Sequence, residues 1–358
     1  MSWRARAALL RLVRGEALER PRSPEAAREL VDEARRQGMV AALRAAAARA
    51  PDAWPDALRE ELAQQHHRQL VRGIQQLQVA AAAQRCLAQE GVRSLPLKGA
   101  ALAEDLYESI ADRPMADVDL LLLDDFGTGL ACLRDAGFEV EDAADHAVCL
   151  WHRPSGVRLE AHRGLASCPG LFPVDAEGWW ARRRGGPDPV PWRPSWEDLL
   201  VQLALHAAFQ HGLVLSLVQY QDLRLVLEKA PLDLDALAAR TRECAAEAAL
   251  ASALLATEAV TGVPLGDGWR GLTAALPHGL RGWLGRRRSD PAALLAPAAP
   301  RLLRLRWELT RGRRLAFVRE AFRGAPTPAG DRRVGTLRRG ARLVRTWAAV
   351  ARSGSRHA

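Results

Sequence analysis

The sequence predicts an α+β fold, in which a small mixed sheet is embedded between N- and C-terminal helical regions. Residues 1–90 are rich in alanine, leucine, arginine and glutamate, and contain few residues that favour strands. Residues 91–165 contain short apolar runs with strand-like alternation. From residue 196 onward helical patterns return, separated by segments rich in glycine and proline.

Length and composition exclude several classes of protein. The chain has 358 residues, of which 48% are hydrophobic and 26% charged, as in a globular protein of two or three domains. It shows neither an apolar run of the ~20 residues that a membrane span needs nor a signal-like apolar segment near residue 1. The five cysteines include no Cys-x-x-Cys pair, so we expect no zinc ribbon or disulfide framework and a cytoplasmic location.

The net charge of +9 is unevenly distributed. Residues 281–358 hold twenty arginines and four acids, which is +16, so residues 1–280 sum to −7. The basic character belongs to the C-terminal end. This end forms either a surface for an anionic partner or charged helices docked on the body, and the sequence does not choose between them.

The Ser23-Pro24-Glu25 run predicts a helix start, because serine can cap the helix that proline begins.

The pattern divides the chain into five parts. The parts are an N-terminal helical region (1–90), an α+β core (91–165), a linker (166–195), a helical domain (196–300) and basic amphipathic helices (301–358).

Within the core, strands and helices alternate. A proline-serine-glycine turn at 154–156 predicts a hairpin between two strands. The expected strands are 92–97, 117–123, 138–140, 147–152 and 157–162, and the expected helices are 98–110 and 126–136.

The rest of the chain is predicted to be helical, after a loop at 166–190. The expected helices are 196–228, 233–261, 301–323 and 335–352, with gaps at 264–300 and 324–331.

Asp117 and Asp119 are the first candidates for chemistry. Two positions apart in a strand, they would share one face, while Val118 and Leu120 point into a core. Neighbouring carboxylates repel each other unless a cation lies between them. Oxygen ligands of this kind suit Mg²⁺.

Glu160 and Lys98-Gly99 complete the candidate site. Glu160 lies on the polar face of the strand 157–162, so it can join the two aspartates if the strands are neighbours. Gly99 opens a helix whose free N–H groups suit a phosphate. Lys98 is one of two lysines among 51 basic residues, and it or Arg113 would supply a counter-charge.

Three histidines receive structural interpretations. We interpret His162 as a structural histidine. His206 and His211 are five residues apart, which is not the i, i+4 spacing of two zinc ligands on a helix, so we interpret them as packing residues.

The motifs resemble the bacterial uncharacterised nucleotidyltransferase family, within the DNA-polymerase-β-like superfamily. The similar segments are Leu97-Lys98-Gly99-Ala100-Ala101-Leu102, Tyr107, Arg113 to Leu121, and Leu159-Glu160-Ala161-His162. A weaker similarity extends from Leu203 to about residue 230.

This resemblance implies transfer of a nucleoside monophosphate from a nucleoside triphosphate (NTP) to an acceptor, with release of pyrophosphate. It implies that Asp117, Asp119 and Glu160 hold two Mg²⁺ or Mn²⁺ ions, and that Lys98, Gly99 and Arg113 contact the triphosphate. The acceptor stays open between a small molecule, a protein and an RNA end. The alternative is a catalytically degenerate scaffold that binds an anionic partner through its basic C-terminal helices.

Overall fold

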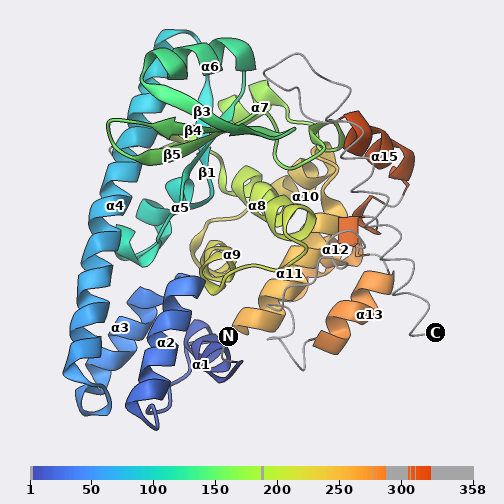
Figure 1. Cartoon of the computed structure of the whole chain (residues 1–358). Coiled ribbons are helices and arrows are strands. Elements are labelled where there is room, and N and C mark those ends of the chain that lie inside the picture. The colour runs from blue at the N-terminus through green and yellow to red at the C-terminus, as the bar shows by residue number, and fades with distance from the viewer. Residues whose placement is uncertain are drawn as a thin grey trace.

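In the computed structural model, a long helix joins an N-terminal helical group to a mixed sheet. Helix α4 (Asp56–Gln89) runs along one side of the molecule from α1 (Trp3–Val13), α2 (Pro24–Gln37) and α3 (Val40–Arg49) to the sheet (Figure 1). The structure describes residues 3–186, 189–276, 278–287, 305–306, 308–310 and 312–323. The predicted start of α2 is confirmed: Ser23 Oγ accepts a hydrogen bond from the Ala26 amide at 3.2 Å.

The sheet has five strands in the order β1-β2-β5-β4-β3. Strands β2 and β5 are parallel, and the other neighbouring pairs are antiparallel. This mixed sheet among helices confirms the α+β prediction. The strands are β1 (Ser94–Leu97), β2 (Val118–Leu122), β3 (Phe138–Ala143), β4 (Ala147–His152) and β5 (Val157–His162), and the helices between them are α5 (Lys98–Leu106) and α6 (Phe126–Asp135).

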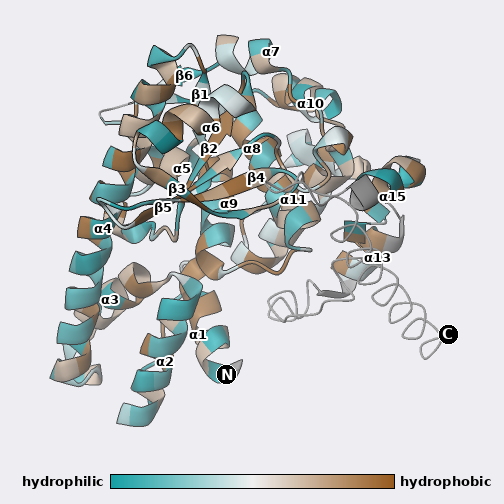
Figure 2. Cartoon of the chain, turned by 45° about the horizontal axis from the view of Figure 1, so that its top comes forward, coloured by the Kyte–Doolittle hydropathy of each residue, from teal (hydrophilic) through white to brown (hydrophobic). Residues whose placement is uncertain are grey.

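Each face of the sheet is covered by helices. Val118, Leu120 and Leu159 pack with residues of α4 and α6 in one hydrophobic core. Leu97 and Leu121 point to the opposite face and belong to a larger core shared with the helices that follow the sheet. In Figure 2 hydrophobic residues gather on the strands and on the helices beside them. The alternation of strand β2 therefore separates its two faces as predicted.

Helix α5 ends earlier than predicted. The sequence favoured a helix from 98 to 110, but α5 ends at Leu106 and a separate 3₁₀ turn, η2 (Ile110–Asp112), follows. Tyr107 leaves the helical conformation, and its hydroxyl donates to Asp222 Oδ1 at 2.6 Å. A long-range hydrogen bond thus overrides the local apolar spacing.

Helix α4 holds the segment between η2 and β2 in place. A Cβ atom at Gly73 would lie 2.4 Å from Ile110 Cγ2, so glycine allows η2 to approach the helix closely. Gln76 Nε2 donates to the Met115 carbonyl at 3.2 Å, and His66 Nε2 lies 2.9 Å from Asp112 Oδ1. This segment leads directly into the Asp117–Asp119 motif.

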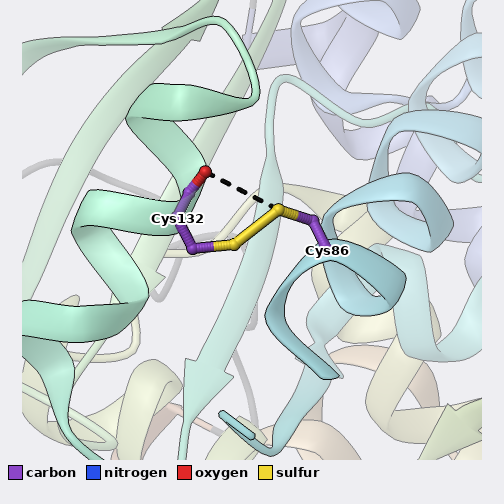
Figure 3. Close-up of a disulfide and its surroundings, with 2 residues drawn as sticks. All are labelled: Cys86 and Cys132. Atoms are coloured by element: carbon purple, nitrogen blue, oxygen red, sulfur yellow. Dashed lines mark hydrogen bonds between the residues drawn. A yellow bond between two sulfur atoms is a disulfide. The ribbon is translucent and has the colours of Figure 1, made fainter. Parts of the chain in front are cut away.

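Helices α4 and α6 are joined by a disulfide between Cys86 and Cys132 (Figure 3). The cysteine pattern predicted no disulfide framework and gave no indication of this single pair. The two cysteines are 46 positions apart, and only the packing of α6 against α4 brings them together. Sequence spacing alone carries no sign of it.

The segment predicted as a loop at 166–190 contains regular structure. It includes η3 (Pro169–Leu171), α7 (Ala176–Ala181) and strand β6 (Arg184–Gly185), which pairs with β7 (Trp192–Arg193). Phe172 and Trp179 are buried in the larger core. Ion pairs such as that between Arg182 and Asp198, at 3.1 Å, fix this segment to the helices that follow.

Two predicted long helices are each broken into two. The expected helix 196–228 consists of α8 (Trp196–Leu205), a π-helical turn η4 (His206–Gln210) and α9 (Leu217–Lys229). The expected helix 233–261 consists of α10 (Leu234–Glu243) and α11 (Glu247–Thr261). The breaks contain residues with positive φ, namely Gly212, Leu213 and Ala245. Because such φ values lie outside the helical region, the chain must turn at these residues.

The C-terminal part that the structure describes packs on the body. The predicted gap at 264–300 contains η5 (Asp267–Trp269), α12 (Arg270–Ala274) and α13 (His278–Arg287), and α15 (Arg314–Arg323) follows. Arg306 Nε donates to the Phe209 carbonyl at 2.7 Å, and Arg313 Nη2 donates to the Ala245 carbonyl at 2.8 Å. These two arginines are thus docked. The predicted helix 335–352 and the gap 324–331 lie outside the described residues.

No helix within the described ranges has both the length and the hydrophobicity required to cross a bilayer.

We predict that Asp222→Asn strongly destabilises the protein. Asp222 Oδ1 accepts from Tyr107 and from Arg113 Nε, the latter at 2.7 Å, and both charged side chains are buried. The variant leaves the Arg113 guanidinium without its counter-charge, which should cost about 3–5 kcal/mol in the free energy of unfolding. Urea denaturation measures this loss. Glu139→Gln removes an exposed pair with Arg153 and should change the same quantity by less than about 1 kcal/mol.

Candidate nucleotidyl-transfer site

A cavity of about 460 Å³ opens where β1 ends and β2 begins, beside the last residues of β5. Its walls include the start of α5, the segment that enters β2, and residues of η4 and α9. All six residues that the sequence singled out line this cavity: Lys98, Gly99, Arg113, Asp117, Asp119 and Glu160. The fold therefore gathers in one place residues that are up to 62 positions apart in the sequence.

Strand register places the two central carboxylates side by side. In the antiparallel pair β1–β2, Leu97 lies opposite Asp119, and in the parallel pair β2–β5, Asp119 lies opposite Glu160. Neighbouring residues in adjacent strands point to the same face, so both carboxylates face the cavity. Asp117 precedes the first residue of β2 and lines the same cavity.

Asp119 is the centre of a buried network. Its Oδ1 atom lies 2.6 Å from Lys98 Nζ and 2.8 Å from His162 Nε2. The same Nε2 atom is 3.3 Å from Glu160 Oε2, so the His162 ring links the two carboxylates. Lys98 thus supplies a positive charge that pairs with Asp119.

The charges of this network shift its pKa values in opposite directions. Burial opposes ionisation of Asp119, but Lys98 and His162 outweigh it and hold the Asp119 pKa far below its usual range. The pKa values of Lys98 and His162 are raised despite their burial, because Asp119 favours their charged forms. The hydrogen bond from His162 lowers the pKa of Glu160.

Asp117 behaves differently from Asp119. Burial, together with the negative charge of Asp119, raises the pKa of Asp117 to about 6. Of the two aspartates, Asp117 is therefore the one whose negative charge the protein compensates less.

Lys98 and Gly99 form the turn from β1 into α5. Lys98 has a φ of 48°, in the left-handed region that non-glycine residues rarely adopt. A Cβ atom at Gly99 would lie 2.6 Å from Met115 Cγ and 3.3 Å from Arg113 Nη1. Glycine is thus required here for the packing of the segment that precedes Asp117, in addition to any approach of a ligand.

Arg113 is held by protein groups. Its Nε atom donates to Asp222 Oδ1, and its Nη1 atom donates to the Pro114 carbonyl at 2.6 Å. Asp222 comes from α9, so this buried ion pair ties the β2 entry segment to the helical region. We therefore interpret Arg113 first as a positioning residue for the wall of the cavity.

The donor set of the cavity fits a divalent cation. Atoms of Asp119, Glu160 and His162 that can bind a metal lie within 4.8 Å of one another, but the charged form of His162, which Asp119 favours, must lose a proton before it can coordinate. The two carboxylates are ligands of the kind that suit Mg²⁺ and Mn²⁺. The imidazole was interpreted as structural from the sequence, yet its position two residues after Glu160 in a strand already placed both on one face.

Two further histidines were missed as site residues. His206 and His211 line the cavity, and their Nε2 atoms are 3.0 Å apart. A separation of five residues argues against a shared face only if both residues lie on an α-helix. The π-helical turn η4 changes that geometry, and no residue pattern indicates it.

Comparison with protein families agrees with this arrangement. Residues 23–262 match the family described as uncharacterised nucleotidyltransferase, which is more than half of the chain. The chain belongs to this nucleotidyltransferase family. The match includes the sheet, the residues of the cavity and the helices from α2 to α11, and it confirms the predicted resemblance to an uncharacterised nucleotidyltransferase family. A comparison with curated proteins gives no match.

We predict that Asp117→Asn stabilises the protein at pH 7 when no metal ion is added. Because the pKa of Asp117 is about 6 in the folded state against 3.8 for the ordinary carboxyl, ionisation opposes folding by up to about 3 kcal/mol at pH 7. The gain in the free energy of unfolding should shrink as the pH falls through 6 and vanish below about 4, where both states are protonated. Urea denaturation across this pH range measures it.

Asp124→Asn is the matched control for this prediction. Asp124 pairs with Arg93 at 2.6 Å, and the hydrogen bonds from Arg93 lower the Asp124 pKa. Its replacement should therefore reduce stability at pH 7. Equal stability of Asp117→Asn and the unmodified protein at pH 7 would contradict the interpretation of Asp117.

Proposed function

We propose that this chain transfers a nucleoside monophosphate from an NTP to an acceptor hydroxyl, with release of pyrophosphate. The observation that carries the proposal is the convergence of Asp119 and Glu160, from neighbouring parallel strands, on a cavity that also holds Asp117. Family membership supports nucleotidyl transfer as the reaction class. The bond that forms joins the acceptor oxygen to the α-phosphorus, and the bond that breaks joins the α-phosphorus to the oxygen that bridges to the β-phosphate. The proton of the acceptor hydroxyl is released to solvent, and the β- and γ-phosphates leave as pyrophosphate.

The carboxylates are the proposed metal ligands. Asp117, Asp119 and Glu160 would hold Mg²⁺ or Mn²⁺, which when bound lowers the pKa of the acceptor and neutralises charge on the leaving pyrophosphate. His162 orients both Asp119 and Glu160 through its Nε2 atom. Its Nδ1 atom is buried without a hydrogen-bond partner among the described residues.

The start of α5 is the proposed binding site for the triphosphate. Gly99 and the following backbone amides lie at a helix N-terminus on the cavity wall, where free N–H groups and the helix dipole favour an anion. Lys98 supplies the positive charge beside the carboxylates. Arg113 contributes charge at the same wall while Asp222 holds it.

The acceptor stays open between a small molecule, a protein and an RNA end, because in each case the NTP itself would occupy the cavity. The cavity volume of about 460 Å³ lies within the range of small-molecule sites, roughly 300–1,000 Å³. We place the reaction in the cytoplasm. The free thiols of Cys149, Cys168 and Cys244 fit that compartment, whereas the Cys86–Cys132 disulfide argues against it.

One observation favours the alternative of a degenerate scaffold. Lys98 already neutralises Asp119, so the central acid is satisfied by the protein alone. In that case the basic C-terminal end would bind an anionic partner. Arg306 and Arg313 do not serve such a surface, because both are used in docking to the body.

We predict that Asp119→Asn abolishes both transfer and the effect of ligand on stability. The unmodified protein should melt at a higher temperature with Mn²⁺ and an NTP, because ligand that binds only the folded state stabilises it. The variant should show no such shift and no pyrophosphate release. Without ligand it should be less stable than the unmodified protein, because Lys98 and His162 lose their buried counter-charge.

Glu141→Gln controls for the loss of a carboxylate from the same sheet. Glu141 lies on β3, is exposed and pairs with Arg158 at 2.9 Å, outside the cavity lining. The Glu141→Gln variant should retain the full ligand-induced increase in melting temperature. Absence of a shift in the unmodified protein, across the four common NTPs with Mg²⁺ or Mn²⁺, would favour the scaffold instead.

A further inference from the structure

The pair of histidines on the cavity wall has no role in the proposed transfer. His206 and His211 both come from the stretch between α8 and α9. Their Nε2 atoms are 3.0 Å apart, and the ring centroids are 4.3 Å apart with the rings near perpendicular. Both side chains line the same cavity as the carboxylates. Two imidazoles with their Nε2 atoms directed at each other form a compact nitrogen donor pair.

A π-helical turn in the backbone brings the two histidines together. On an α-helix, residues five apart diverge by roughly 140° around the axis. Here the His211 amide donates to the His206 carbonyl at 3.1 Å, which is the i+5 bond of a π-helical turn and brings the two residues to one face. Leu213 then adopts a φ of 63°, and the Tyr220 hydroxyl donates to its carbonyl at 2.8 Å. A strained turn that is held by a buried tyrosine is typical of a functional site.

The chemistry of the pair suits a metal ion. Desolvation and the nearby Lys98 charge lower the pKa of His206 well below its ordinary value and, although His211 is exposed to solvent, that of His211 to about 4, which favours neutral rings at pH 7. Neutral imidazole is the form that binds metals. Tetrahedral Zn–N bonds of about 2.0–2.1 Å place two ligand nitrogens roughly 3.3–3.4 Å apart. The observed distance of 3.0 Å is shorter, so the two rings would have to separate slightly to bind one ion.

We propose that His206 and His211 form a binding site for Zn²⁺, separate from the cluster of Asp119, Glu160 and His162. Imidazole nitrogens select Zn²⁺ and related transition metals over Mg²⁺, which prefers oxygen ligands. With two protein ligands, the remaining positions of the ion are open to water or to an oxygen of a ligand in the cavity. One wall of the cavity thus offers carboxylate oxygens, which suit Mg²⁺, and another wall offers imidazole nitrogens, which suit Zn²⁺.

The simplest competing explanation is a hydrogen bond between the two rings with no metal involved. One Nε2–H group can donate to the other Nε2 at the same distance. The two explanations differ in what the protein does when Zn²⁺ is added. If the two rings form only a hydrogen bond and have no affinity for metal, replacing one of the histidines leaves the number of bound Zn²⁺ ions unchanged.

Zinc titration of the full chain tests the proposal. The chain is stripped with a chelator, titrated with Zn²⁺ by calorimetry, and analysed for bound zinc after dialysis. We expect His211→Gln to lose one Zn²⁺ per chain relative to the unmodified protein. His67→Gln, at an exposed position on α4, should lose none. Substitution by Co²⁺ adds a visible absorption band that reports nitrogen ligation and should disappear in His211→Gln.

Asp119→Asn separates this site from the proposed catalytic carboxylates. The Asp119→Asn variant should still bind the Zn²⁺ ion that the His211→Gln variant loses. This result is expected whether or not nucleotidyl transfer is found. His206→Gln provides a second removal of the pair, and thermal unfolding shows that each variant is folded. An unmodified protein that binds no Zn²⁺, or folded His206→Gln and His211→Gln variants with unchanged zinc content, would overturn the proposal.

Discussion

The buried negative charge of Asp119 is the constraint around which the site is organised. A carboxylate so deep in the protein is tolerated only with compensating partners, because removal of a charge from water is costly. Lys98, at the start of α5 directly after β1, and His162, at the end of β5, supply that compensation from either side of β2. Correct pairing of β1, β2 and β5 therefore brings the charges together, and the charges in turn favour that pairing over a slipped register.

The rest of the fold fixes the walls around this charge. Helix α4 contacts the N-terminal helices at one end and the sheet at the other, and it holds the segment before β2 through Gln76 and His66 (Figure 1). On the other side, Arg113 and Asp222 tie the same segment to α9. The segment that carries Asp117 is thus clamped between two parts of the chain, which limits movement of the acidic motif.

The electrostatic asymmetry between the two aspartates has a consequence for ligand binding. Asp119 is already paired, whereas Asp117 carries a charge that the metal-free protein opposes. A bound cation would relieve Asp117 most. Part of the binding free energy of a cation would therefore come from removing an unfavourable interaction that exists before it arrives.

Much of the site could be predicted from the sequence, because it depends on local rules. The two-residue spacing of Asp117 and Asp119, the polar-face position of Glu160 and the Lys98-Gly99 helix start all follow from strand and helix periodicity. Tertiary structure decided the rest. The Lys98–Asp119 pair, the Cys86–Cys132 disulfide and the facing rings of His206 and His211 depend on packing between distant elements or on a π-helical turn. Sequence spacing does not encode these contacts, since it measures distance along a chain whose path only the whole fold determines.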